Sequence, residues 1–276
     1  MLAAWVQGEP ASSIGLDDRG LHYGDGLFET IGASGGRARF LGAHLARLAR
    51  GCAALSIPAP DAALLAREVT RAAGLAPHVI IKVIVTRGAL QERGYAWTGS
   101  ESPTRIVCAW PWSEGPLAMR APARTGLATR PAAPPLLPGI KHLNCLGQVL
   151  ARQEARQRGL DEVILADPEG CIIGGGMTNL FVYTGDTLAT PLAARCMVAG
   201  VMRAQVLAAA ESAGFRACER AITAQELAGA EALWITNVRV GLWPVGGLGQ
   251  RTYAAHPRTS ILQHAIEQSA CEAAGA

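Results

Sequence analysis

The sequence predicts an α+β protein built from two domains. Two stretches rich in β-branched residues, 78–86 and 104–110, have the composition of strands in a buried sheet, and helical apolar spacing precedes them. An irregular, proline-rich stretch then separates this half from a second half that again mixes strands and helices. Half of the 276 residues are apolar, so the chain can bury a substantial core.

The domain boundary is placed from the prolines. Between Pro111 and Pro138 the chain contains P-W-S-E-G-P near the start and P-A-A-P-P-L-L-P near the end, with room for one strand between them. We therefore expect a small N-terminal α+β domain over 1–112, a linker over 113–120 and a larger C-terminal domain over 121–276. The larger domain is expected to carry the reactive lysine described below.

The elements of the first half follow from local patterns. Short strands are expected around a turn at Asp17-Asp18-Arg19-Gly20. A first helix is indicated by apolar residues at helical spacing, namely Leu41, Leu45, Leu48 and Leu55. A second helix is expected over 61–73, before the two strands already named.

The second half reads as alternating helices and strands. A helix should end at Gly159, and another should begin at Gly200 and close at Gly214. Thr223 followed by Glu226 is a capping-box start for a short helix. The remaining elements are strands at 162–166, 171–173, 179–183 and 232–237, and a final amphipathic helix over 260–273.

Composition excludes several functional classes. The net charge of +3 is spread along the chain without a basic run, so a nucleic-acid partner is not expected. No stretch of about 18 apolar residues and no basic, apolar leader are present, which predicts a cytoplasmic protein without a membrane partner. Seven scattered cysteines without a C-x-x-C pair predict neither a disulfide framework nor a metal site. Cys145, close to the reactive lysine, is read as a small buried residue rather than a nucleophile.

Lys141 is the first candidate for chemistry. It lies in P-G-I-K-H-L-N between apolar Ile140 and Leu143. An amine in apolar surroundings is held in the neutral form, which condenses with an aldehyde to a Schiff base. Taken alone, the segment favours an exposed lysine whose flanking residues pack inward, so a reactive role for Lys141 depends on the rest of the chain.

Five segments, in order along the chain, give that context. They are R-G-L-H-Y-G-D-G-L-F-E-T (19–30), A-H-L-A-R-L (43–48), G-I-K-H-L-N (139–144), T-N-L-F (178–181) and G-V-M-R (200–203). Together they resemble the fold-type IV pyridoxal phosphate enzymes, which include branched-chain aminotransferases, D-amino-acid aminotransferases and 4-amino-4-deoxychorismate lyases. The resemblance implies a two-domain α+β fold, an active site in the cleft between the domains, a homodimer and pyridoxal 5'-phosphate as cofactor.

The resemblance also implies roles for particular residues. Lys141 would be the Schiff-base lysine and the catalytic residue. The other cofactor-binding positions would be Arg47, Val201, Met202, Asn237 and Val238, with Arg47 and the backbone N–H groups at 201 and 202 on the phosphate. The substrate positions would be Tyr23, Phe28, Arg93, Tyr95 and Arg239, with the arginines on carboxylates. Simpler readings are a solvated helix-face arginine for Arg47, a turn residue for Asn237 and hydrated loop arginines for Arg93 and Arg239.

Two local patterns are similar to the lyase branch of the family. K-H-L-N (141–144) replaces the small residues and tyrosine that usually follow the lysine in branched-chain aminotransferases, and T-R-G-A-L-Q-E-R-G-Y (86–95) ends in the lyase-like R-G-Y. The implied reaction converts aminodeoxychorismate, the small-molecule substrate, to 4-aminobenzoate and pyruvate on the way to folate.

One position departs from the family pattern. Gly174 stands where these enzymes usually place a glutamate that keeps the pyridine nitrogen of the cofactor protonated. A protonated ring is the deeper electron sink, so its loss should harm transamination more than an elimination whose product is aromatic. Two alternatives stay open: a branched-chain or D-amino-acid aminotransferase, and a degenerate member that binds the cofactor weakly. The run Gly174-Gly175-Gly176 fits a flexible turn or a close approach of the backbone.

Overall fold

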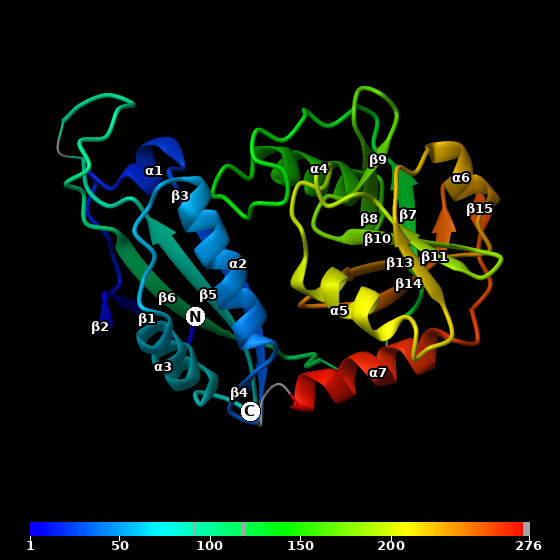
Figure 1. The fold of residues 1–276 in the computed structure, drawn as a ribbon, viewed down its shortest axis with the longest axis horizontal. Helices are drawn as coiled ribbons and strands as arrows, with labels where there is room; N and C mark the ends of the chain where they lie inside the picture. Colours follow the sequence, from blue (N-terminus) through cyan, green and yellow to red (C-terminus); the bar gives the residue numbers. More distant parts are fainter. Residues whose placement is uncertain (91, 117–119, 273–276) are drawn as a thin grey trace. The chain divides into compact units, whose positions relative to one another are not determined.

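The protein is described by a computed structural model covering residues 1–90, 92–116 and 120–272 (Figure 1). The chain divides into two compact units. Unit 1 contains Met1–Pro116, Ile140–Asn144 and Ala270, and unit 2 contains Cys145–Ser269 and the segment that ends at Gly139. Part of the expected linker, 117–119, lies outside the described residues.

Unit 1 is organised around a six-stranded antiparallel sheet with the order β2-β1-β6-β5-β3-β4. The long central strands arise from the β-branched stretches seen in the sequence. The strands are β1 (Ala3–Val6), β2 (Glu9–Pro10), β3 (Gly26–Ser34), β4 (Arg37–Ala38), β5 (His78–Thr86) and β6 (Thr104–Pro111).

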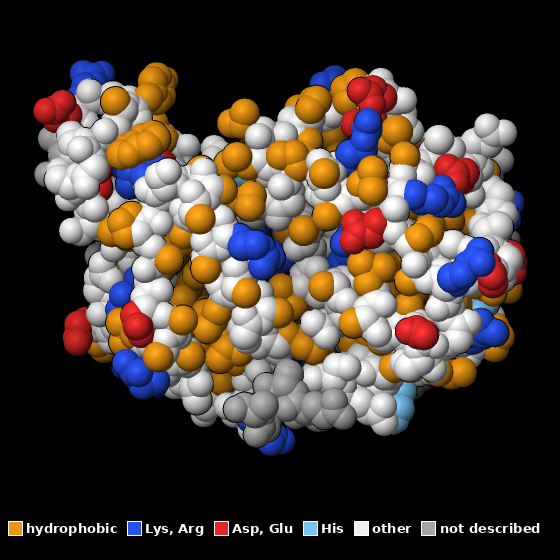
Figure 2. Space-filling view, in the orientation of Figure 1, with side chains coloured by type: hydrophobic (Ala, Val, Ile, Leu, Met, Phe, Trp, Pro, Cys, Tyr) orange, Lys and Arg blue, Asp and Glu red, His pale blue; other side chains and the backbone are white. Residues whose placement is uncertain are grey.

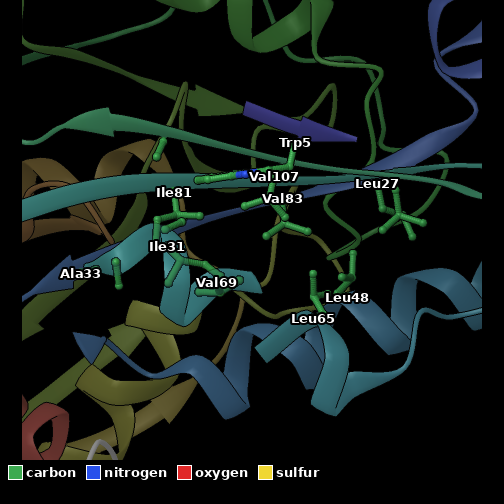
Figure 3. Packing of buried hydrophobic residues seen from close by; sticks show 14 of the residues in the cluster. Trp5, Leu27, Ile31, Ala33, Leu48, Leu65, Val69, Ile81, Val83 and Val107 are labelled. Carbon is green, nitrogen blue, oxygen red and sulfur yellow. The ribbon is translucent and has the colours of Figure 1, made fainter. Parts of the chain in front are cut away.

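Two helices, α2 (Leu41–Ala54) and α3 (Ala62–Ala73), cover one face of this sheet. Strand β5 alternates between buried and half-buried side chains because successive residues of a strand point to opposite faces. The buried side chains of β5 join a hydrophobic core between the sheet and the two helices (Figure 3). This core includes Ile31, Ile81, Val83 and Val107 from the sheet and Leu48, Leu65 and Val69 from the helices. The opposite face of β3 and β5 carries the half-buried residues that matter for the site.

A short helix, α1 (Arg19–Tyr23), occupies the segment where the sequence predicted only a turn between strands. The side chain of Asp18 accepts a hydrogen bond from the backbone N–H of Gly20 at 2.8 Å, as an N-cap does. Gly24 ends the helix in the left-handed conformation, with a φ of 62°. These two caps surround only five residues, which is too short for an apolar period to be recognised.

The segment that carries Lys141 belongs to unit 1, whereas the sequence led us to expect it in the larger C-terminal domain. Its backbone explains the difference. The N–H of Phe28 donates to the carbonyl of Lys141 at 3.0 Å, and the N–H of Leu143 donates to the carbonyl of Gly26 at 2.9 Å. The segment thus runs along the beginning of β3 and is fixed to it by main-chain hydrogen bonds.

Unit 2 contains a mixed sheet of nine strands. Eight follow the order β12-β11-β10-β13-β14-β7-β8-β9, and β15 pairs with β14. The pairs β7–β8, β7–β14 and β11–β12 are parallel and the others antiparallel. The strands are β7 (Ala123–Leu127), β8 (Glu162–Ala166), β9 (Ile172–Gly175), β10 (Asn179–Thr184), β11 (Thr187–Thr190), β12 (Arg216–Glu219), β13 (Ala232–Asn237), β14 (Gly241–Leu248) and β15 (Arg251–Thr252).

The helices of unit 2 are α4 (Leu146–Gln157), α5 (Val201–Ala209), α6 (Ala224–Gly229) and α7 (Thr259–Glu272). The capping box of α6 is formed by Thr223 and Glu226 as the sequence predicted. The prediction that α5 extends to Gly214 was wrong. The helix ends at Ala209, and the chain leaves it through turns in which Gly214 has a φ of 77° and the N–H of Phe215 bonds to the carbonyl of Ala210.

Among the described residues, no helix is both long and apolar enough to cross a bilayer. On the face drawn in Figure 2, acidic and basic side chains are interspersed rather than gathered into one field.

Candidate active site

Lys141 is half-buried and fixed beside Phe28. Its Nζ lies 4.0 Å from the centre of the Phe28 ring, and the main chain on both sides of the lysine is bonded to β3. Lys141 is therefore not the exposed surface lysine that the sequence left open. The structure brings Lys141 and Phe28 together, two residues that the sequence assigned to one site.

Lys82 is a second lysine near the Phe28 ring, and no sequence motif pointed to it. Its Nζ lies 4.9 Å from the centre of the Phe28 ring, so the two lysine nitrogens are no farther apart than the two distances together, 8.9 Å. Lys82 belongs to the half-buried face of β5, two positions from Ile84, which pairs with Phe28. A charged residue in the middle of the β-branched run H-V-I-I-K-V-I-V-T was the signal that could have identified it.

Arg47 is buried, with 7% of its surface exposed, so it is not a solvated helix-face arginine. Its Nε and NH2 donate to the two oxygens of Glu29, at 2.7 and 2.6 Å. His44, one turn earlier on α2, donates from Nδ1 to the same carboxylate at 2.7 Å. Glu29 lies in the segment 19–30 and His44 in the segment 43–48, but the sequence suggested no role for either. Only the fold brings Glu29 of β3 next to His44 and Arg47 of α2.

The charges of this cluster are set by burial and by one another. Burial by itself would raise the pKa of Glu29, but the hydrogen bonds and charges of Arg47 and His44 lower it below its ordinary value. Burial lowers the pKa of His44, the charges of Arg47 and Lys141 act in the same direction, and Glu29 opposes them. Glu29 is therefore ionised, and His44 is neutral with its proton on Nδ1.

Three further predicted residues, Tyr23, Arg93 and Tyr95, also lie in unit 1. The rings of Tyr23 and Tyr95 are 5.3 Å apart, which brings α1 and the loop between β5 and β6 together. Tyr95 is 83% exposed, and Arg93 is exposed in the same loop.

In unit 2, helix α5 begins at Val201 after Gly200, as the motif G-V-M-R predicted. A Cβ on Gly200 would lie 2.0 Å from Oδ1 of Asn179, so a side chain at the N-cap position would require the Asn179 amide to move. The first N–H groups of a helix have no partner within it and carry its positive dipole end, which suits a phosphate group. The loop that leads to this helix is hydrogen-bonded to Gly139. The N–H of Gly139 donates to the carbonyl of Cys196 at 2.8 Å, and the N–H of Ala199 donates to the carbonyl of Gly139 at 3.0 Å.

Asn237, Val238 and Arg239 follow the end of β13, also in unit 2. Asn237 Oδ1 accepts from the N–H groups of Arg239 and Val240 at 2.8 and 2.9 Å, and its Nδ2 donates to the carbonyl of Met177 at 3.2 Å. Asn237 therefore has the turn role that the sequence offered as the simpler reading. Val238 is half-buried and Arg239 is exposed.

Two of the three glycines in the run 174–176 belong to a strand rather than to a turn. Gly174 and Gly175 end strand β9, and the N–H of Gly175 donates to the carbonyl of Thr178 at 2.8 Å. Gly174 has a φ of 131°, and a Cβ there would meet the oxygen of Thr178 at 3.0 Å. The backbone thus disfavours any side chain at the position where the family usually has glutamate.

Glu162 is a buried carboxylate next to this run, and the sequence indicated only that it begins a strand. It is fully buried, accepts from the N–H of Met177 at 3.1 Å and from Oγ1 of Thr178 at 3.0 Å. A Cβ on Gly175 would come within 2.9 Å of the Glu162 side chain. Glu162 holds the 176–178 segment in place through these bonds. A glutamate at the head of an otherwise apolar strand was the available signal.

One group of possible metal ligands occurs among the described residues, formed by Asp167, Glu169 and Cys171. Arg195 NH1 binds Asp167 at 2.6 Å and its NH2 binds Glu169 at 2.7 Å. Both carboxylates are thus paired with the same arginine.

Comparison with known proteins gives this geometry a context. Residues 26–248 match the family described as amino-transferase class IV. An aminodeoxychorismate lyase of Vibrio harveyi is 31% identical over 246 residues, which cover 88% of this chain and 90% of the relative. A D-alanine aminotransferase of Bacillus licheniformis is 26% identical over 270 residues, with 93% and 92% covered.

The crystal structure of 4-amino-4-deoxychorismate lyase from Pseudomonas aeruginosa is 38% identical, with a TM-score of 0.85 and coverage of 96% of this chain and 98% of that one. The resemblance inferred from the five motifs and the α+β fold of the fold-type IV enzymes are thereby confirmed. The chain belongs to the class IV aminotransferase family.

Proposed function

We propose that the protein is an aminodeoxychorismate lyase, which converts 4-amino-4-deoxychorismate to 4-aminobenzoate and pyruvate on the way to folate. The observation that carries the proposal is the fixed, half-buried Lys141 beside Phe28 in a chain with lyase-like K-H-L-N and R-G-Y segments. The similarity to the lyases of Vibrio harveyi and Pseudomonas aeruginosa supports it.

The residues present fit pyridoxal 5'-phosphate. Lys141 offers an amine held in place by its main chain, and the start of α5 is kept free of a side chain at Gly200. In the Glu29 cluster, Nε2 of His44 is buried and has no hydrogen-bond partner among the described residues, as expected beside a site that receives a further polar group. Lys141 would hold the cofactor covalently, and Arg47, Val201, Met202, Asn237 and Val238 would contact it. When bound, the cofactor supplies an electron sink for the carbanion formed from the substrate.

Lys141 would perform the proton transfers. Its free amine would take the proton from the ring carbon that bears the substrate nitrogen. The bond between the neighbouring ring carbon and the ether oxygen breaks, and the three-carbon unit leaves as enolpyruvate. The same lysine returns its proton to that group, which becomes pyruvate, so no net proton is consumed. The product ring is aromatic, which favours this outcome even with a shallow electron sink.

The chain's cations would orient the substrate, which carries two carboxylates. Lys82 and Lys141 both lie near the Phe28 ring, and Lys82 is the lysine of β5. We assign one carboxylate to Lys82 and retain Arg93, Tyr95 and Arg239 as candidates for the other, with Tyr23 and Phe28 lining the site. Glu29 would fix the plane of the Arg47 guanidinium through its two-point ion pair.

The test is spectroscopic and chemical. The purified protein is mixed with pyridoxal phosphate beside Lys141→Ala, and aminodeoxychorismate is then added while 4-aminobenzoate fluorescence is followed. The wild-type chain should show a visible band that the variant lacks, and it should form product. Absence of both band and product would refute the enzyme proposal and leave the degenerate family member.

The alternative function is transamination, for which the similarity to a D-alanine aminotransferase is the specific observation. It predicts formation of pyruvate from D-alanine only when an oxo acid is present, whereas the lyase forms pyruvate from aminodeoxychorismate without one. Gly174 counts against transamination because the expected carboxylate is missing. The homodimer implied by the family is measured by light scattering in the same preparation.

A further inference from the structure

The loop between β5 and β6 carries two of the proposed substrate residues, Arg93 and Tyr95. It runs from residue 87 to 103, far longer than the two to five residues that usually join adjacent antiparallel strands. A long exposed connection loses substantial conformational entropy when it is held in one arrangement. Something must therefore hold this loop if its side chains are to meet a substrate in a defined geometry.

Arg19 of helix α1 holds the main chain of the loop. Its NH1 donates to the carbonyls of Gly94 and Ala96 at 3.3 and 3.0 Å, and its NH2 donates to the carbonyl of Tyr95 at 2.6 Å. Arg19 is only 3% exposed, although the loop it binds is largely exposed. One guanidinium thus fixes three consecutive carbonyls, beginning at the residue after Arg93.

Asp25 links Arg19 to a second arginine, Arg87. The Nε atoms of both arginines lie 2.8 Å from Oδ2 of Asp25, and NH2 of Arg87 donates to Oδ1 at 3.1 Å. Arg87 also donates to the carbonyls of Leu55 and Ser56, just beyond α2. The loop is thereby attached, through one carboxylate, to both α1 and the end of α2.

Ring contacts complete the attachment. The Arg87 guanidinium lies 4.2 Å from the centre of the Trp97 ring, and the Arg19 guanidinium lies 5.0 Å from that of Tyr23. Tyr23 in turn contacts Tyr95, at 5.3 Å between ring centres. Both the backbone and the aromatic side chains of 94–97 are therefore held by α1 and the two arginines.

A different pair in unit 1 shows what a mainly structural ion pair looks like. Arg105 binds Glu68 of α3 through Nε and NH2 at 2.7 and 2.9 Å, which joins a helix to the sheet. Arg19 instead directs its NH1 and NH2 to carbonyls of an exposed loop. Burying two arginines for that purpose carries a desolvation cost that connectivity alone does not require.

We propose that Arg19, Asp25 and Arg87 are positioning residues that fix the 94–97 segment and so hold Arg93 and Tyr95 ready for the carboxylates of the substrate. The inference rests on the proposed function for the identity of that substrate. The three residues act through the loop and do not touch the reacting atoms.

The experiment compares Asp25→Asn and Arg19→Lys with the wild-type holoenzyme, and uses Glu68→Gln as the matched control for loss of a buried ion pair. Hydrogen exchange of the 92–99 amides is measured by mass spectrometry, and KM and kcat are measured with aminodeoxychorismate. In Asp25→Asn, loop exchange and KM should each rise by about tenfold to a hundredfold, the range given by losing one or two charge-assisted bonds. The visible cofactor band and kcat should stay within about twofold.

Arg19→Lys keeps the charge but lacks the planar fork, so its KM and loop exchange should fall between those of the wild type and Asp25→Asn. Glu68→Gln should lower thermal stability while leaving KM and loop exchange unchanged. Circular dichroism reports whether each variant is folded.

Two results would overturn the inference. One is loop exchange that stays at the wild-type level in Asp25→Asn, and the other is faster loop exchange with an unchanged KM, which would make the network structural only. If the wild-type chain forms no 4-aminobenzoate, the proposed function fails, and calorimetric binding of aminodeoxychorismate replaces KM. Equal affinity of wild type and Asp25→Asn would then overturn the positioning role.

Discussion

Glu29 and Arg47 form a two-point ion pair that is almost entirely removed from solvent. The distances are 2.7 and 2.6 Å, and the side chains are 1% and 7% exposed. A bidentate pair fixes the orientation of the guanidinium as well as its position, which a single contact would not do.

Glu29→Gln tests the energetic weight of this pair. Removing the charge of one partner of a buried ion pair is costly, so we expect a loss of about 3–5 kcal/mol in the free energy of unfolding. Urea unfolding followed by circular dichroism measures it. Asp186→Asn breaks an exposed pair with Arg216 and should change little. Equal losses in the two variants would contradict this account.

Lys82→Ala tests the assignment of a substrate carboxylate to Lys82. The visible cofactor band should persist, because Lys141 is untouched, while KM for aminodeoxychorismate should rise by about tenfold or more. Steady-state kinetics by 4-aminobenzoate fluorescence measures it. Lys82→Arg should recover part of the affinity because it restores the charge. A KM unaltered by Lys82→Ala would remove Lys82 from the substrate site.

Gly174→Ala tests the backbone at the missing carboxylate. The φ of 131° and the 3.0 Å approach to the Thr178 oxygen predict a loss of about 1–3 kcal/mol in stability. Gly185→Ala is the control, because Gly185 has a φ of 66° and open space around its Cβ position, and should cost about 1 kcal/mol. Thermal unfolding separates the two. For the same reason, Gly174→Glu should gain no transaminase activity. If this variant were as stable as the wild type and more active with D-alanine, the backbone would be shown to accommodate the carboxylate.

The pH dependence of stability tests the neutral state of His44. The folded-state pKa of His44 is lowered from its ordinary value of 6.5, so the unfolded chain binds the proton more tightly. The contribution of neutral His44 to the free energy of unfolding is therefore complete above pH 6.5. It is lost progressively as the pH falls from 6.5 towards the lowered pKa of the folded state. Glu29, whose pKa is also lowered, adds a loss in the same direction below its ordinary value of 4.5.

His142 and His256 also have lowered pKa values, so the wild-type slope is a sum of several groups. His44→Gln isolates one of them. The decline in unfolding free energy between pH 7.5 and pH 5.5 should be smaller in this variant than in the wild type. Identical slopes would mean that His44 is not held neutral in the fold.

The sequence predicted the elements whose signal is local. Strands β5 and β6 were recognised from runs of β-branched residues, helices α2 and α3 from their apolar spacing, and α6 from its capping box. Strands β11, β12 and β14 were not predicted. The first two are four residues long, and β14 contains three glycines and a proline, so none offers a period to recognise.

The site was predictable where motifs named its residues and not where the fold brings distant residues together. Lys141 and Arg47 were named as candidates from motifs that resemble the family, and their roles stay predictions. Lys82 and Glu162 were missed because each is a lone charge in an apolar strand, and its meaning depends on which face of the sheet it occupies. The role of Asp25 could not be predicted from the sequence either, because its two arginine partners are separated from it by 6 and 62 residues.

The conformation of Gly174 has an evolutionary consequence. A codon change to glutamate would meet the carbonyl of Thr178, which is already bonded to the N–H of Gly175, so the segment up to Thr178 would have to change with it. Placing a ring-nitrogen carboxylate at this position would therefore strain the backbone unless the segment up to Thr178 changed as well.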